Sequence, residues 1–225
     1  MFRRPFLETL SPSDRETLNA RMTLRSYDKG EMVISVAEGG RDVYFVLEGR
    51  AHALLYSSDG KAVDYREIGA GDMFGELAAI DGQPRSASVV AQDPTRIGRL
   101  SHVAFQDLVD NHRTFAWTLL THLSTQVRDM TGRIFEYSTL VVRERLIREL
   151  IRLAGGDAIE TGPAEIRPAP THFDLAARIS THREAVSREM SAMAKQGLVV
   201  KRAGALYLHD IAALRALCPP EDWHP

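Results

Sequence analysis

The chain has 225 residues, of which 44% are hydrophobic and 26% charged, and its formal net charge is −2. This length predicts one larger and one smaller domain, and the single cysteine, Cys218, excludes an internal disulfide framework or a four-thiolate cluster. No apolar run approaches the roughly 20 residues that cross a bilayer, and the N-terminus lacks the apolar core of a signal peptide, so we expect a cytoplasmic protein without a membrane partner.

The first part of the chain has the pattern of a β-rich domain. Ser11 and Pro12 predict the cap and first turn of a short helix. From about Met22 to Leu100, short apolar runs alternate with turns, which predicts a sandwich or barrel. Strands are expected at 43–47, 51–56 and 62–66, with turns at 38–40, 48–49, 58–60 and 69–72.

The segment from Phe74 to Ala91 places two opposite charges, Glu76 and Arg85, nine residues apart among small and apolar residues. Charges in such surroundings require partners. Gly75 permits close approach of the backbone, and residues 76–80 predict a short helical turn whose free N–H groups favour an anion. After a turn at 81–84, the planar fork of Arg85 suits two phosphate oxygens.

Gly75-Glu76-Leu77-Ala78 and Pro84-Arg85-Ser86-Ala87 resemble the two halves of the phosphate-binding cassette of cyclic-nucleotide-binding domains. The resemblance implies a β-roll in which Arg85 holds the cyclic phosphate, Glu76 the ribose 2′-hydroxyl, and the amides of Gly75 and Leu77 line the phosphate. The alternative is a surface turn with a solvated Arg–Glu pair. The expected nucleotide-binding set in this segment is Phe74, Gly75, Glu76, Leu77, Ala78, Arg85, Ser86 and Ala87.

From about Ser101 the pattern becomes helical. Apolar residues recur at steps of three and four, which predicts a seam of about three heptads. Such a seam could pack on the β-domain, but with the resemblance we expect it to pair with its twin in a homodimer. Its members are Leu119, Leu123, Val127, Met130, Ile134, Tyr137 and Val141.

The C-terminal part predicts two helices joined by a short turn. A helix over 143–153 is expected to end at Gly155-Gly156, followed by a loop with a short strand at 164–167. Thr171 and Asp174 have the spacing of a capping box. After the interruption at 180–182, a helix over 183–193 turns Val186, Met190 and Met193 inward, an arrangement typical of helix-turn-helix proteins.

The following hairpin, 198–202 and 205–208, completes a segment that resembles the winged DNA-binding domain of the catabolite activator/fumarate–nitrate regulator family. The resemblance implies that Arg183, Glu184 and Arg188 read bases in half-sites with a TGTGA-like core. His182 and Ala185 depart from the catabolite activator. The alternative is a helical hairpin with a solvated charged face. The expected DNA-binding set is Thr171, Thr181, Arg183, Glu184, Ser187, Arg188 and Lys201.

Together these patterns predict an α+β protein with a β-roll at 1–113, a dimerisation helix at 114–139 and a winged helix-turn-helix at 140–225. We expect a dimeric regulator of transcription that binds palindromic promoter DNA when it holds cAMP, or cGMP as the second choice, with RNA polymerase as a further partner. The resemblance places Met130 and Thr131 against the base, and Ser86 could hydrogen-bond a guanine. No metal is expected, and we find no motif of an enzyme.

Two other functions fit the same architecture. A haem-based sensor would need axial ligands, for which His52, His102, His112 and His122 are available. A cyclic-nucleotide regulatory subunit would bind another protein in place of DNA. The single cysteine excludes an iron–sulfur sensor.

Overall fold

The computed structural model describes residues 4–56, 62–156 and 159–219. The chain forms two compact units, the first made by Arg4–Thr125 and the second beginning at Gln126. The boundary lies inside one helix, α5 (Arg113–Thr139), which the sequence predicts as a separate segment at 114–139. Each unit has its own hydrophobic core.

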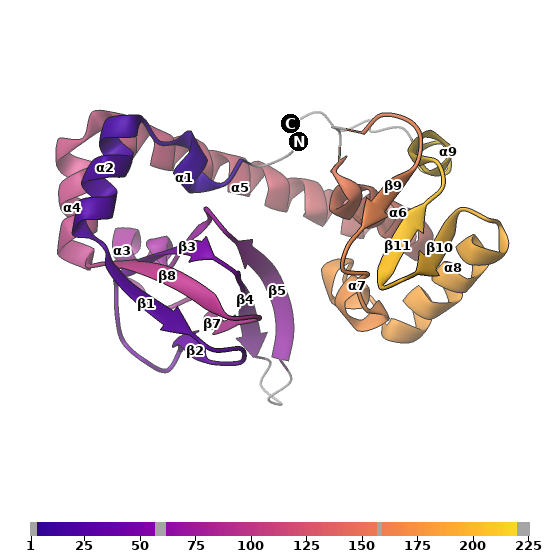
Figure 1. Ribbon diagram of the computed structural model, residues 1–225, viewed down its shortest axis with the longest axis horizontal. Helices are drawn as coiled ribbons and strands as arrows, with labels where there is room; N and C mark the ends of the chain where they lie inside the picture. Colours follow the sequence, from indigo (N-terminus) through magenta and orange to yellow (C-terminus); the bar gives the residue numbers. More distant parts are fainter. Residues whose placement is uncertain (1–3, 57–61, 157–158, 220–225) are drawn as a thin grey trace. The chain divides into compact units, whose positions relative to one another are not determined.

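The first unit contains two antiparallel four-stranded sheets, with strand orders β1-β8-β3-β6 and β2-β7-β4-β5. The helices α1, α2 and α4 gather at one end of these sheets (Figure 1). The turn expected at 58–60 lies outside the described residues. The elements are α1 (Phe6–Thr9), α2 (Pro12–Arg21), β1 (Thr23–Tyr27), β2 (Met32–Ile34), β3 (Val43–Glu48), β4 (Arg50–Tyr56), β5 (Ala62–Gly69), β6 (Met73–Phe74), α3 (Glu76–Asp81), β7 (Ser88–Ala91), β8 (Thr95–Leu100) and α4 (His102–Asn111).

Sequence pattern and burial agree in this unit. Ser11 caps α2 by accepting the N–H of Asp14, and Pro12 stands in the first turn, as predicted. Apolar residues from both sheets form the inner core, including Val46, Ala53 and Ile97. A second cluster lies beneath the helices and contains Phe6, Phe45, Phe105 and Phe115 among others. The predicted β-roll is therefore confirmed.

The second unit is a winged helix. Its three-stranded sheet has the order β10-β11-β9, so the predicted hairpin is joined by the short strand expected near 164. Val186, Met190 and Met193 are buried against this core, as predicted. After the end of α5, the elements are α6 (Val142–Ala154), β9 (Ala164–Ile166), α7 (His172–Arg178), α8 (Arg183–Lys195), β10 (Val199–Arg202), β11 (Ala205–Leu208) and α9 (Ile211–Arg215).

Within the described ranges, no helix is both long enough and apolar enough to span a bilayer.

Candidate functional site

Gly75 begins the cassette with a backbone conformation that side chains rarely adopt. Its φ is +82°, and it caps the N-terminus of α3. A Cβ built at this position would lie 2.7 Å from Nη1 of Arg85 and 3.1 Å from the carbonyl oxygen of Asp42. Glycine is therefore required here both for the turn and for the close approach of Arg85.

The guanidinium of Arg85 is buried and held by main-chain oxygens. Nη1 donates to the carbonyl of Gly75 and Nη2 to that of Asp42, each at 2.8 Å. Among the ion pairs between described residues, none includes Arg85. Burial lowers the pKa of this guanidinium, against the opposing effects of Tyr44, Asp42 and Glu76. A fixed cation with neutral acceptors is a suitable partner for a ligand anion.

The other predicted cassette residues divide by burial. Glu76 is 4% exposed in the first turn of α3, so its carboxylate belongs to the same buried site region as Arg85. Phe74 and Ala78 are buried, and their predicted contact with a nucleotide stays a prediction. Leu77 and Ser86 are exposed, whereas Ala87 is partly buried against the inner core.

Two residues that the sequence analysis missed hold Arg85 in place. Asp42 offers its carbonyl to Arg85, while its carboxylate accepts from Nε of Arg99 at 2.6 Å and from the N–H of His102 at 2.9 Å. Tyr44 lies under the guanidinium at 5.8 Å and stacks on Phe74 with ring centroids 5.3 Å apart. No local motif marks either residue, because the contacts join segments far apart in sequence.

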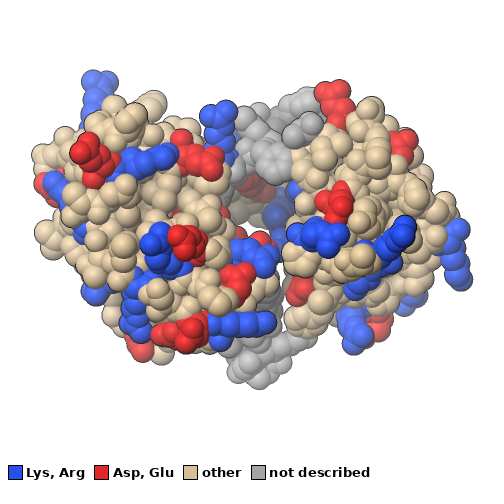
Figure 2. Space-filling view, in the orientation of Figure 1, with Lys and Arg blue, Asp and Glu red and all other residues tan. Residues whose placement is uncertain are grey.

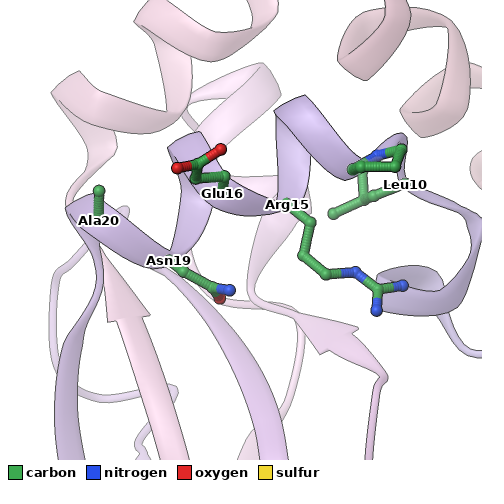
Figure 3. A pocket seen from close by; sticks show the side chains of 6 residues that line it. Leu10, Arg15, Glu16, Asn19 and Ala20 are labelled. Carbon is green, nitrogen blue, oxygen red and sulfur yellow. The ribbon is translucent and has the colours of Figure 1, made fainter.

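An open hollow of about 710 Å³ lies beside α2 in the first unit (Figure 3). Arg15, which points along it, already donates to the carbonyl oxygen of Leu7. The hollow contains none of the predicted cassette residues, and its polar side chains belong to one exposed helix face. We therefore assign it no role. It is lined by Leu10, Pro12, Arg15, Glu16, Asn19 and Ala20.

The apolar seam predicted for the long helix is wrong for three of its seven members, whereas Val127, Met130, Ile134 and Tyr137 are exposed in α5 as predicted. Leu119 and Leu123 pack on the core of the first unit, and Val141 lies beyond α5, as the residue that caps α6. An exposed stripe of α5 keeps Val127 and Ile134 of the predicted seam and adds Trp117 and Leu120, with exposed fractions between 54% and 72%. Between and after these apolar residues, the positions that continue the alternating three- and four-residue spacing hold exposed hydroxyl residues, namely Ser124, Thr131 and Ser138.

These seam hydroxyls are bonded within their own helix. Ser124, Thr131 and Ser138 each donate to the carbonyl four residues earlier, at 2.8 to 2.9 Å. Thr131 thus belongs to the exposed stripe, and Met130 is 42% exposed beside it. Both lie in the second unit, and their predicted contact with a bound base stays a prediction.

The helix-turn-helix is built as its sequence predicts. Thr171 accepts the N–H of Asp174, whose carboxylate in turn accepts the N–H of Thr171, so the capping box is confirmed. In the turn, Ser180 has a φ of +52° and the N–H of Thr181 donates to Ala176 at 3.0 Å. The helix α8 then begins at Arg183.

The predicted base-reading side chains Arg183, Glu184 and Arg188 are exposed on α8, and Lys201 is exposed on β10. Ser187 is different, because its hydroxyl lies 2.8 Å from Nδ1 of His172. Burial lowers the pKa of His172, and the positive charges of Lys201 and Arg183 lower it further. His172 is thus a neighbour of the predicted DNA contacts that the sequence analysis did not identify.

Charge is mixed on the surface. Figure 2 shows basic and acidic side chains interspersed over the face in view, without one large field of a single sign. On this face, positive charge is therefore local, which agrees with the net charge of −2.

The histidines considered as haem ligands have other surroundings. Nδ1 of His112 lies 3.6 Å from the buried carboxylate of Asp14. His122 is buried with its ring edge-on to Phe6, at 5.2 Å between centroids. Among the described residues, no three His, Cys, Asp or Glu side chains come together as a metal site.

Comparisons with known protein families match a different domain to each of the two units. Residues 24–112 match the cyclic nucleotide-binding domain, and residues 144–217 match the Crp-like helix-turn-helix domain. The Cyclic AMP receptor protein of Thermus thermophilus is 26% identical over 214 residues, which are 95% of this chain and 96% of that protein.

Two further relatives share part of the sequence or the fold. The cAMP-dependent protein kinase regulatory subunit of Mycosarcoma maydis is 35% identical over 103 residues, 46% of this chain and 19% of that protein. The structure of the c-di-GMP responsive global regulator CLP of Xanthomonas campestris matches with a TM-score of 0.73 at 18% identity, covering 88% of this chain and 99% of that one. At this identity the second match concerns the fold.

Proposed function

Because the chain belongs to the catabolite activator/fumarate–nitrate regulator family of transcription regulators, we propose that it is a cytoplasmic homodimer that binds palindromic promoter DNA under the control of a cyclic nucleotide. The main support for this proposal is the environment of Arg85. Its buried guanidinium is held by main-chain oxygens beside Gly75, which has a left-handed backbone conformation.

The cassette favours an anionic ligand with a hydroxyl group. Arg85 binds the cyclic phosphate, the first amides of α3 line it, and Glu76 accepts the ribose 2′-hydroxyl. We propose cAMP as the first ligand, in line with the relatives named for cAMP. The exposed hydroxyl of Ser86 is placed after Arg85 and supports cGMP as the alternative.

The exposed stripe of α5 supports pairing with a second copy. Trp117, Leu120, Val127 and Ile134 repeat at heptad spacing and are exposed in one chain, so they are available for a twin helix. Since Thr131 lies in this stripe, we propose that it and Met130 meet the base near the dimer seam.

Arg183, Glu184 and Arg188 of α8 then read base edges in the major groove, while Thr171, Thr181, Ser187 and Lys201 contact phosphates. In a two-fold dimer, the recognition helices bind half-sites about 34 Å apart. Nucleotide binding shifts the conformational equilibrium of the dimer toward the arrangement that fits this spacing. RNA polymerase then binds the protein–DNA complex.

Calorimetric titration tests the ligand, with cAMP, cGMP and c-di-GMP as separate arms. Duplexes selected by the protein from a randomised pool in the presence of cAMP then test DNA binding, by anisotropy with and without nucleotide. We expect cAMP to bind and to strengthen DNA binding by at least about fivefold. Failure of both cAMP and cGMP to bind would contradict the proposal.

A further inference from the structure

A buried carboxylate joins three helices of the second unit. Glu149 on α6 is 1% exposed. Its oxygens lie 2.9 Å from Nη1 of Arg152, 3.6 Å from Nη1 of Arg178 and 3.9 Å from Nη2 of Arg133. These arginines belong to α6, α7 and α5 respectively. Glu149 therefore contacts both the last part of the long helix and the first helix of the helix-turn-helix.

A second carboxylate on α5 extends the cluster. Glu136 pairs with Arg152 and with Arg148, the latter at 3.6 Å. The cluster thus contains two carboxylates and four guanidinium groups. Burial lowers the pKa of Arg133, but the carboxylate of Glu149 raises it, and the net shift is upward. Glu149 consequently holds together positive groups that would otherwise repel one another.

Two hydrogen bonds from α5 reach the last residue of α7. Nη1 of Arg133 and the hydroxyl of Tyr137 donate to the carbonyl oxygen of Arg178, at 3.4 and 2.9 Å. Arg178 is the last residue of α7, and only residues 179–182 separate it from α8. The C-terminal part of α5 is therefore bonded to the helix-turn-helix directly before its turn.

We propose that Glu149 and Arg133 are positioning residues that transmit the position of α5 to the recognition helix. The inference rests on the proposed function, because it concerns how nucleotide binding changes DNA affinity. When α5 moves, Arg133 and Tyr137 move with it, and their hydrogen bonds to the carbonyl oxygen of Arg178 displace the end of α7. Without the pair, the helix-turn-helix still folds around its own core but no longer follows α5.

Arg133→Gln in the full-length protein tests the inference, since this half-exposed side chain can be changed without burying a new charge. The quantity measured is the ratio of DNA dissociation constants without and with cAMP, on the selected duplex. We expect this ratio to fall at least about fivefold toward one, while the affinity for cAMP without DNA stays within about twofold. Arg128→Gln, an exposed arginine of the same helix, should keep the wild-type ratio.

Two further variants separate positioning from folding. Arg133→Lys should recover part of the ratio, because charge returns without the planar fork. Glu149→Gln should lower the ratio as Arg133→Gln does, with Glu160→Gln as its exposed control and a thermal melt to verify folding. A wild-type ratio in Arg133→Gln overturns the inference. A wild-type protein whose DNA affinity ignores cAMP overturns the proposed function instead.

Discussion

In the first unit, Arg85, the proposed phosphate-binding cation, is 9% exposed and is held by main-chain oxygens from two segments. In the second unit, the proposed base-reading residues Arg183 and Arg188 lie exposed on one helix. A buried, fixed cation selects a small ligand by shape and charge. Exposed arginines suit a long polyanion, whose phosphates repeat along the duplex and whose base edges are accessible in the major groove. The difference teaches that the proposed ligand-binding group is preorganised by burial, whereas the proposed DNA-binding groups are presented on an exposed helix.

Arg85→Ala is expected to have the largest effect, because it removes the preorganised charge. Loss of a charge-assisted hydrogen bond costs about 1.5–3 kcal/mol, which is a fall in cyclic-nucleotide affinity of at least about tenfold. Calorimetric titration with cAMP measures this change in affinity. Arg96→Ala, which removes an arginine that pairs with Glu48 on the surface, should bind nucleotide as the wild type does. Equal affinity in the two variants would remove the cassette assignment.

Arg188→Ala should act on sequence discrimination. Loss of a bidentate base contact costs about 1–3 kcal/mol of preference for the selected duplex over random DNA. Lys201→Ala provides the contrast, because loss of its proposed phosphate contact should weaken binding to both duplexes alike. Anisotropy with both duplexes measures the two ratios. An unchanged ratio in Arg188→Ala would show that this arginine does not read bases.

Gly75→Ala tests the preorganisation itself. The left-handed conformation costs a side chain about 1–2 kcal/mol, and the added Cβ would also displace Arg85. We expect a lower melting temperature together with weaker nucleotide binding. Gly39→Ala is the matched control, since a Cβ there meets nothing within 4 Å and the backbone is not left-handed. Nucleotide binding as strong as in the control would contradict the role of Gly75.

The smallest expected effect is on the pH dependence of stability, through Asp14. Burial raises the pKa of this carboxyl, but hydrogen bonds from Thr114 and Ser11 and the charge of His112 together lower it by more, so the net shift is downward. The resulting stabilisation is present at neutral pH and is lost as the pH falls below about 4.

Thermal melts of the wild type and Asp14→Asn across this pH range provide the measurement. We expect the variant to be less stable by about 1 kcal/mol at pH 7, and the difference to shrink on acidification. A difference that grows in acid would contradict the assignment.

How much the sequence predicts depends on the range of the contacts. The capping box at Thr171, the strands β3 and β4 and the short helix after Gly75 are local, and each is predicted from residues a few positions apart. Asp42 and Glu149 are missed because their contacts join distant segments. Leu119 and Leu123 are wrongly included in the predicted seam, since periodicity alone does not show which face of a helix the first unit covers.

The boundary between the two units lies inside the single helix α5, with no loop there. The alignment of the exposed stripe along this helix therefore depends on the number of residues between its members. Each residue added to an α-helix turns the rest of that helix by about 100° and advances it by about 1.5 Å. One alanine inserted after Thr125 would therefore turn Val127 and Ile134 out of line with Trp117 and Leu120 on the helix, whereas seven inserted residues, about two full turns, would nearly restore the stripe.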